Sequence, residues 1–449
     1  MEMSAKVASF LLRHNIHNEP IIVPTDSKAD AVALFFGIAL SANYYVPLDK
    51  ETPEGRLKDI ISIGDIHYSF GLNADGLTFL SKEEAFSTSI DKTAVEKAYS
   101  KHKEEDPLYL MFTSGSTGKP KGVLKSHKNI LSFVKNFEES FPSFGKGRRF
   151  CNQAPLYFDA SSKDIYLSLA IESALYFPSK SVYALPKTTI DYLNDNRIDT
   201  LLWVPSALTL IAKLRTLKFM KPLYLKDVYF IGESFMPKYL NMWLEALPST
   251  HFVNWYGSTE VAGAALYFEI PGLMDETRPL PVGKPLKNNE VSLDEGEILL
   301  SSDQVALGYV KDEERNAKTF IVKDDKRWLR TGDYGSFDKD GNVVFESRKD
   351  YQIKHLGYRI ELQDIEVAVS SLEGILSSCA LYQKDKDAIV LALELSNNGR
   401  NISDGEWIRR FRAVLPEYMI PKRIIRLDKM PLNPNGKIDR VLLAKELEK

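Results

Sequence analysis

The sequence has little cysteine, no block of one charge and no long apolar run. Its two cysteines, Cys151 and Cys379, stand far apart among 449 residues, so they cannot build a disulfide framework or a metal site. We expect them to fill the core of a protein kept in a reducing setting. The net charge is only −3, and no surface typical of nucleic-acid or membrane binding is indicated.

We also expect no membrane-spanning or secretory segment. The apolar run at residues 31–42 is shorter than the roughly 20 residues that span a bilayer, and it predicts a buried helix followed by a strand. The first residues carry Glu2 and too short an apolar run for a signal peptide. The sequence therefore predicts a cytoplasmic protein with no membrane partner.

The pattern along the chain predicts an α/β fold. Apolar runs bounded by breakers predict buried strands at residues 108–113, 200–205, 227–232 and 251–257, and amphipathic stretches between them predict helices. Such alternation indicates a large, layered α/β domain. From residue 283 to 345 the pattern becomes mostly β.

A second, smaller domain is predicted after this β-rich part. Charge rises and glycines appear near residues 346–357, and about 100 residues of mixed helix and strand character follow, enough for a small α+β domain. We therefore expect a large N-terminal domain over residues 1–347 and a small, mobile C-terminal domain over 348–449.

The stretch "TSGSTGKPKG" has the composition of a phosphate-binding loop. Hydroxyl groups can donate to phosphate oxygens, glycines let backbone N–H groups close round an anion, and lysines supply charge. The residues concerned are Thr113, Ser114, Gly115, Ser116, Thr117, Gly118, Lys119 and Lys121. A P-loop kinase is excluded, because Pro120 breaks the helix that must follow such a loop.

With four further motifs in the expected order, this loop resembles the adenylate-forming superfamily of acyl-CoA ligases, luciferases and adenylation domains of nonribosomal peptide synthetases. The motifs are "NWYGSTE", "RTGDYG", "SRKDYQIKHLGYRIEL" and "NPNGKIDR". The resemblance implies an ATP- and Mg²⁺-dependent enzyme that joins a carboxylate to AMP, releases pyrophosphate and then passes the acyl group to a thiol.

The resemblance also implies roles for single residues in nucleotide binding. It places adenine against Tyr256, with Asn254 near its amino group and Gly257 in the same motif. Asp333 and Arg348 would contact the ribose, while Thr259 and the magnesium ligand Glu260 would lie at the α-phosphate. Without the motifs, Tyr256 would be a core residue, Asp333 a turn residue and Glu260 a charge at a helix start.

The C-terminal motifs imply catalysis from the small domain. Lys437 resembles the catalytic lysine that bridges the carboxylate and the α-phosphate, where a fixed positive charge stabilises the transition state. Asp350 resembles the hinge about which the small domain rotates between half-reactions, and Gly357 would then line the thiol tunnel. Leu356 stands where the family usually has arginine.

The stretch "FDAS" resembles amino-acid-activating adenylation domains. Asp159 would pair with the α-ammonium group of the substrate and Lys437 with its carboxylate; the alternative is that Asp159 caps the helix that follows. Motif alignment places these further residues in the pocket wall: Ala160, Lys163, Trp203, Tyr229, Ile231, Trp255, Gly263 and Ala264.

Three large aromatic residues in this wall favour a small side chain such as that of glycine, alanine or serine. Lys163 leaves an alternative open. If its ammonium group points inward, an acidic substrate would satisfy it; if it reaches water, it has no effect.

No carrier domain follows the last motif, so we expect a stand-alone enzyme that loads a separate carrier protein on its phosphopantetheine thiol. Compared with full-length relatives the N-terminus is short. The competing interpretations are an acyl-CoA ligase for a non-amino acid and a noncatalytic nucleotide-binding relative.

Overall fold

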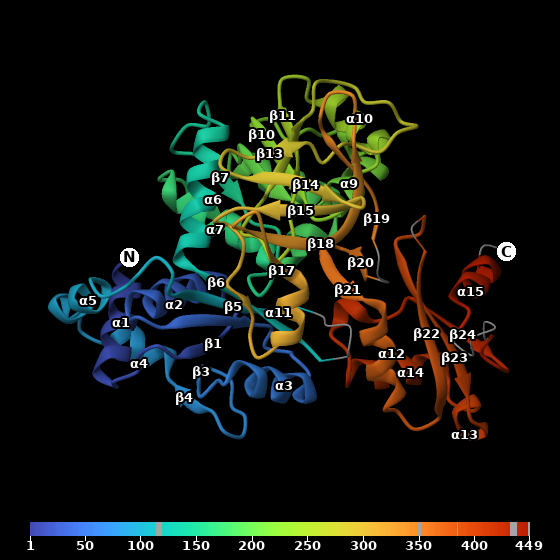
Figure 1. Cartoon of the computed structure of the whole chain (residues 1–449), viewed down its shortest axis with the longest axis horizontal. Helices are drawn as coiled ribbons and strands as arrows, with labels where there is room; N and C mark the ends of the chain where they lie inside the picture. The colour runs from blue at the N-terminus through green and yellow to red at the C-terminus, as the bar shows by residue number, and fades with distance from the viewer. Residues whose placement is uncertain (114–118, 349–351, 384, 432–437, 448–449) are drawn as a thin grey trace. The chain divides into compact units, whose positions relative to one another are not determined.

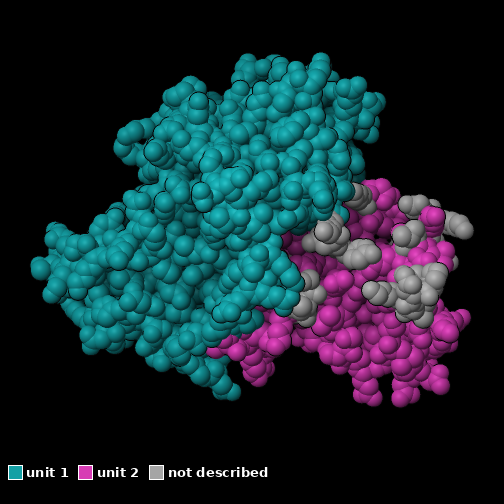
Figure 2. Space-filling model, in the orientation of Figure 1, with its two compact units in different colours: residues 1–50, 63–111, 122–349 teal, residues 51–62, 112–121, 350–449 magenta. Residues whose placement is uncertain are grey.

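The computed structural model describes residues 1–113, 119–348, 352–383, 385–431 and 438–447. The chain divides into two compact units (Figure 2). The first comprises residues 1–50, 63–111 and 122–349, and the second comprises 51–62, 112–121 and 350–449. A large α/β unit and a smaller α+β unit are the fold class predicted from the sequence. The boundary at residues 347/348 stays a prediction.

Two seven-stranded sheets dominate the first unit (Figure 1). The first has the order β16-β6-β5-β2-β1-β3-β4. Strands β1 to β4 and the β2–β5 pair are parallel, and β16 runs antiparallel to β6. The bounds are β1 Pro20–Pro24, β2 Tyr44–Leu48, β3 Tyr68–Phe70, β4 Thr78–Leu80, β5 Pro107–Thr113, β6 Lys121–Ser126 and β16 Gly308–Tyr309.

Five helices alternate in the chain with strands of the first sheet: α1 Glu2–Arg13, α2 Lys28–Leu40, α3 Glu54–Gly64, α4 Lys82–Ser87 and α5 Lys92–Tyr99. Most of α3 belongs to the second unit. Helix α1 packs against α2, α4 and α5. Helix α2 and strand β2 are the buried helix and strand predicted around residues 31–48.

The second sheet has the order β13-β12-β11-β10-β9-β7-β8. Its parallel strands β9 to β11 are buried along their length apart from the first residue of β11, as continuous apolar runs between helices require. The bounds are β7 Arg149–Cys151, β8 Ala174–Tyr176, β9 Thr200–Trp203, β10 Asp227–Ile231, β11 His251–Tyr256, β12 Leu266–Glu269 and β13 Lys284–Pro285.

The helices around this sheet begin where their sequences predict. Helix α6 starts after Ser126, which forms a capping box with Asn129. Three others start at a proline, which fits the first turn because it lacks an N–H group. The bounds are α6 His127–Ser140, η1 Asp159–Ser161, α7 Ser162–Ala170, η2 Lys180–Ala184, α8 Pro186–Asp195, α9 Pro205–Lys213, η3 Thr216–Lys218 and α10 Pro237–Ala246.

The β-rich part predicted for residues 283–345 forms a third, antiparallel sheet in the order β14-β15-β18-β17, with β19 paired to β18. Its elements are β14 Glu290–Asp294, β15 Glu297–Ser301, α11 Glu313–Thr319, β17 Phe320–Lys323, β18 Lys326–Phe337 and β19 Val343–Arg348.

The second unit combines a hairpin, a three-stranded sheet and short helices. The hairpin is β20 Gln352–His355 with β21 Tyr358–Glu361. The sheet β22-β23-β24 buries one face against α12 and α14. The bounds are α12 Leu362–Ser370, β22 Ile375–Gln383, β23 Ala388–Leu395, α13 Asn397–Arg400, α14 Asp404–Arg412, η4 Glu417–Met419, β24 Arg423–Leu427 and α15 Arg440–Leu447.

Both cysteines are free and buried, as the sequence predicted. Cys151 lies in the apolar cluster on one face of the second sheet, and Cys379 lies in the core of the second unit. Burial raises the pKa of each thiol to about 12. In the described ranges, every helix is too short or too polar to cross a bilayer.

Candidate active site

Several candidate residues lie outside the described part of the chain. They are the loop residues Ser114, Gly115, Ser116, Thr117 and Gly118, the proposed hinge Asp350 and the proposed catalytic Lys437. Of the loop residues that are described, Thr113 is buried at the end of β5 and Lys119 is exposed. Lys121 is buried, with Nζ 3.4 Å from Oε1 of Glu361.

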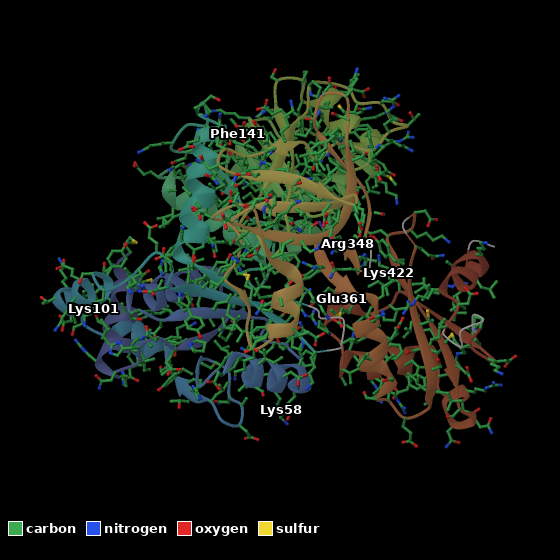
Figure 3. The ribbon with its side chains drawn as sticks, in the orientation of Figure 1. Lys58, Lys101, Phe141, Arg348, Glu361 and Lys422 are labelled. Carbon is green, nitrogen blue, oxygen red and sulfur yellow. The ribbon has the colours of Figure 1, made fainter. Side chains whose placement is uncertain are left out.

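Three predicted nucleotide residues meet in the first unit. The Tyr256 hydroxyl donates to Oδ2 of Asp333 over 2.6 Å. Nη1 of Arg348, labelled in Figure 3, lies 2.7 Å from Oδ1 of Asp333, an ion pair without hydrogen-bond geometry. Burial, and then the Asp333 carboxylate, raise the pKa of Tyr256 well above its usual value, so the phenol keeps its proton.

The turn around Asp333 is built by its neighbours. The Thr331 hydroxyl donates to the carbonyl of Ile298 and accepts from the backbone N–H of Asp333. Gly332 adopts a φ of +71°, which favours glycine, and its N–H donates to Glu297. The Asp333 side chain is only 3% exposed, and both of its oxygens lie in contact with Tyr256 or Arg348.

Glu260, the predicted magnesium ligand, is also buried, and a neighbouring tyrosine hydrogen-bonds its carboxylate. Oε1 of Glu260 accepts a hydrogen bond of 2.7 Å from the hydroxyl of Tyr309. The backbone around it is fixed by the bridge between Val261 and Val305 and by Gln304, whose side-chain amide donates to the carbonyls of two alanines in the same loop. Thr259 is half-buried in the turn before Glu260. This one carboxylate therefore has a fixed direction.

Asn254 and Gly257 flank Tyr256 near the end of β11. The side-chain amide nitrogen of Asn254 donates to the carbonyl of Pro281 over 2.8 Å. Among the described residues, none donates to its amide oxygen. A Cβ atom on Gly257 would lie 3.0 Å from the carbonyl oxygen of Gly263, so a larger residue there would need the Gly263 backbone to shift by a few tenths of an ångström.

Asp159 has two partners that the sequence did not reveal. Its Oδ1 accepts from Nζ of Lys125 over 2.7 Å and from the Tyr109 hydroxyl over 2.9 Å. The Lys125 side chain is fully buried, and that of Asp159 is 11% exposed. Asp159 opens the short helix η1 and caps no helix through its side chain, so the capping alternative is wrong.

Lys163 does not reach water. Its side chain is 2% exposed, its ammonium group donates to the carbonyl of Ala160, and Nζ lies 3.7 Å from Oδ1 of Asp164. Burial lowers the pKa of Lys163 and raises that of Asp164, while each group's charge opposes the shift of the other. The two residues neutralise each other, so an acidic substrate is not needed to balance Lys163.

Trp203 lies on the opposite face of the second sheet from Tyr229, another predicted wall residue. Side chains alternate along β9, and Trp203 packs with Leu208 and Tyr183 in the cluster on the opposite face of the sheet. Its indole N–H donates to the carbonyl of Cys151. The face shared with Tyr229 is taken by Leu202 instead. The prediction of Trp203 in the pocket wall is therefore wrong.

Tyr229 and Trp255 remain side by side, with ring centroids 4.6 Å apart. They belong to an apolar cluster that also contains Ile231, Ala264 and the phenylalanines of α6. Gly263 adopts a φ of +65°, and a Cβ atom there would lie 2.3 Å from the ring of Phe133. Aromatic rings thus fill much of this region. Among the described residues, none hydrogen-bonds the buried Nε1 of Trp255.

In the second unit, Gly357 lies in the turn of the β20–β21 hairpin. Leu356 and Gly357 have φ values of +52° and +81°, the pair of positive values typical of a type I′ turn. A turn role alone therefore explains this glycine, and its place in a thiol tunnel stays a prediction.

Comparison with known proteins decides the family. The model of the family described as "AMP-binding enzyme" matches residues 1–310, more than half of the chain. This chain belongs to the AMP-binding enzymes. The predicted resemblance to adenylate-forming enzymes is thereby confirmed.

Among curated AMP-binding enzymes, the D-alanine–D-alanyl carrier protein ligase of Staphylococcus aureus is 33% identical over 415 residues, covering 89% of this chain and 84% of the relative. A solved NRPS protein containing adenylation and PCP domains has a TM-score of 0.84 and 22% identity, over 99% and 78% of the two chains. An o-succinylbenzoate CoA synthetase from Bacillus subtilis has a TM-score of 0.85 at 19% identity, over 99% and 92%.

Sequence reasoning missed Lys125, Tyr109 and Tyr309. A signal for Lys125 was present, because "KGVLKS" is a strand pattern in which Lys125 shares a face with Val123 and precedes the Ser126 helix cap. A lysine on the apolar face of a short strand demands a buried carboxylate nearby. No such signal marks Tyr109 or Tyr309, since tyrosines in strands are ordinarily core residues.

Proposed function

We propose that this chain activates a small amino acid with ATP, forming an aminoacyl-adenylate and pyrophosphate, and transfers the aminoacyl group to the phosphopantetheine thiol of a separate carrier protein. The observation that carries the proposal is the Asp159 carboxylate at the start of η1, in a chain 33% identical to a D-alanine–carrier protein ligase. Its other oxygen, Oδ2, is where the α-ammonium group would bind.

Alanine is the substrate that we assign to the site, and its D-form is suggested only by the name of the S. aureus relative. The aromatic cluster around Tyr229 and Trp255 limits the side chain to a small one. Asp164 already neutralises Lys163, which removes the reason to expect an acidic substrate. The name of the S. aureus relative points to the same amino acid.

For the nucleotide, we assign adenine to Tyr256 and Asn254 and ribose to Asp333 and Arg348. The contacts of Tyr256 and Arg348 with Asp333 support the assignment, because they bring the three residues together around one carboxylate. Ribose binding would displace one of these contacts. The loop at residues 113–121 would hold the phosphates.

Magnesium would arrive with the nucleotide. In the described part of the chain, no group of three metal-binding side chains could hold an ion alone. Mg²⁺ nevertheless needs only one or two carboxylates when phosphates supply the other oxygens. Glu260, oriented by Tyr309, fits that need. The ion would neutralise phosphate charge as the substrate carboxylate attacks the α-phosphorus beside Thr259.

Lys437, Asp350 and Gly357 keep the roles of catalytic lysine, hinge and tunnel residue as proposals, as do the mobile small domain and the cytoplasmic location. Lys437→Ala should lower adenylation by several orders of magnitude and leave transfer from preformed adenylate nearly unchanged. An equal loss in both half-reactions would contradict a role in one domain orientation only.

The test is ATP–pyrophosphate exchange over the twenty amino acids, their D-forms, and fatty and aryl acids. We expect exchange with one or a few small amino acids, led by alanine. Exchange with fatty or aryl acids alone would favour the alternative, an acyl-CoA ligase for a non-amino acid. The absence of exchange with every acid would favour a noncatalytic nucleotide-binding relative.

A further inference from the structure

The Lys125 ammonium group already pairs with the Asp159 carboxylate, the negative charge that the substrate's amino group would otherwise meet. Its Nζ lies 2.7 Å from Oδ1 of Asp159, 3.4 Å from the carbonyl oxygen of Val261 and 5.5 Å from the centre of the Tyr109 ring. The side chain is completely buried. These contacts fix the ammonium group beside the carboxylate.

The pair is electrically balanced before any substrate arrives. Burial lowers the pKa of Lys125, and the Asp159 and Glu260 carboxylates oppose that shift by favouring its charged form. A buried lysine ammonium and a buried carboxylate in direct contact neutralise each other, and each would be costly to leave alone.

The same carboxylate still offers one hydrogen-bond acceptor. Both Lys125 and Tyr109 donate to Oδ1. No described residue donates to Oδ2, and the Asp159 side chain keeps 11% of its surface exposed. A substrate group on the α-carbon therefore meets an oxygen that can accept a hydrogen bond but whose charge is already compensated.

This arrangement reduces the advantage of a positive substrate group. An ammonium group on Oδ2 would be a second cation on one carboxylate and would be repelled by Lys125. A hydroxyl group can donate the same hydrogen bond without adding charge. A site that hydrogen-bonds a substrate donor still rejects an analogue that lacks the donor, because the acceptor is then left without a partner.

We propose that Lys125 is a specificity-determining residue that lets this site activate small 2-hydroxy acids as well as amino acids. The inference rests on the proposed function and widens its substrate class. The step is unchanged: the carboxylate oxygen forms a bond to the α-phosphorus, the bond from that phosphorus to the bridging oxygen breaks, and pyrophosphate leaves. The α-hydroxyl group only binds Asp159.

The test measures ATP–pyrophosphate exchange with alanine, lactate and propionate, using both isomers of the first two. These acids share a three-carbon skeleton and carry an ammonium group, a hydroxyl group or neither. For the wild type we expect kcat/KM for lactate within about 100-fold of that for alanine, and at least about 10-fold above that for propionate. Lactate exchange no better than propionate exchange would overturn the proposal.

Lys125→Met tests whether the Lys125 charge is the reason that the site accepts a 2-hydroxy acid. Without the ammonium group, Asp159 gains an uncompensated charge that favours a cationic substrate, so the alanine-to-lactate ratio should rise by about 10-fold or more. Lys128→Met is the matched control, because Lys128 is a part-exposed lysine three residues away, paired with Asp303, and should leave the ratio unchanged. An unchanged ratio in Lys125→Met would also overturn the proposal.

The outcomes separate this inference from the function on which it rests. Exchange with alanine but not with lactate defeats the inference alone, whereas no exchange with any acid defeats both. The wild-type panel requires no variant, so the proposal stays testable if Lys125→Met fails to fold. Lys125→Arg, which keeps the charge, should then retain the wild-type ratio.

Discussion

The buried pair of Lys125 and Asp159 gives the sharpest stability prediction. In Asp159→Asn, the fully buried Lys125 ammonium loses the carboxylate 2.7 Å away, while the Tyr109 hydroxyl keeps an oxygen to which it can donate. Removing one partner of a buried ion pair costs about 3–5 kcal/mol. We therefore expect the free energy of unfolding of the first unit to fall by that amount.

Urea unfolding followed by tryptophan fluorescence measures this loss, because four of the five tryptophans lie in the first unit. The control is Asp303→Asn, which breaks the exposed pair with Lys128, 3.0 Å apart. It should cost less than about 1 kcal/mol.

A double-mutant cycle separates the pair from its surroundings. Lys125→Met combined with Asp159→Leu replaces both charges by apolar groups and should recover most of the loss, because an apolar replacement of a buried pair is often neutral. The reasoning is refuted if Asp159→Asn lowers the free energy of unfolding no more than Asp303→Asn does. It is also refuted if the loss in the double variant equals the sum of the losses in Lys125→Met and Asp159→Leu.

Three further predictions concern other parts of the first unit. Tyr309→Phe removes the hydrogen bond that orients Glu260, so the Mg²⁺ concentration for half-maximal exchange should rise about 10-fold; an unchanged Mg²⁺ dependence contradicts the assigned role. Gly263→Ala forces a Cβ atom to 2.3 Å from the Phe133 ring at a φ of +65° and should lower the free energy of unfolding by about 2–4 kcal/mol; an unshifted urea midpoint refutes it. Burial, and then a neighbouring histidine, lower the pKa of His127 from 6.5 to about 4. The unfolded chain therefore binds the extra proton as the pH falls through this range, and stability declines below pH 6.5. His127→Gln should flatten that decline in urea midpoints, and an equal slope in both proteins excludes the effect.

The strands and helices could be read from the sequence where local pattern decides them. Strands β5, β9, β10 and β11 are apolar runs ended by breakers, and each begins within one residue of its predicted start. Helix α6 is marked by Ser126 and Asn129, whose capping box needs only neighbours in the chain. Local rules of this kind require no knowledge of the tertiary fold.

The site could be predicted less well from the sequence, because its side-chain contacts join segments that are distant along the chain. Lys125 and Asp159 are 34 positions apart, and Glu260 and Tyr309 are 49 apart. Nothing in either segment shows which partner it meets. Trp203 was misplaced for a related reason: β9 is buried on both faces, so its composition does not reveal which side chains point to which face.

The most direct test of the central claim is a crystal structure of the protein with a nonhydrolysable alanyl-adenylate analogue. We expect the α-ammonium group within hydrogen-bond distance of Oδ2 of Asp159, the ribose hydroxyl groups on Asp333 and the adenine against Tyr256. An ammonium group held elsewhere, with Asp159 still bonded only to Lys125 and Tyr109, would contradict the claim that this carboxylate anchors an amino acid.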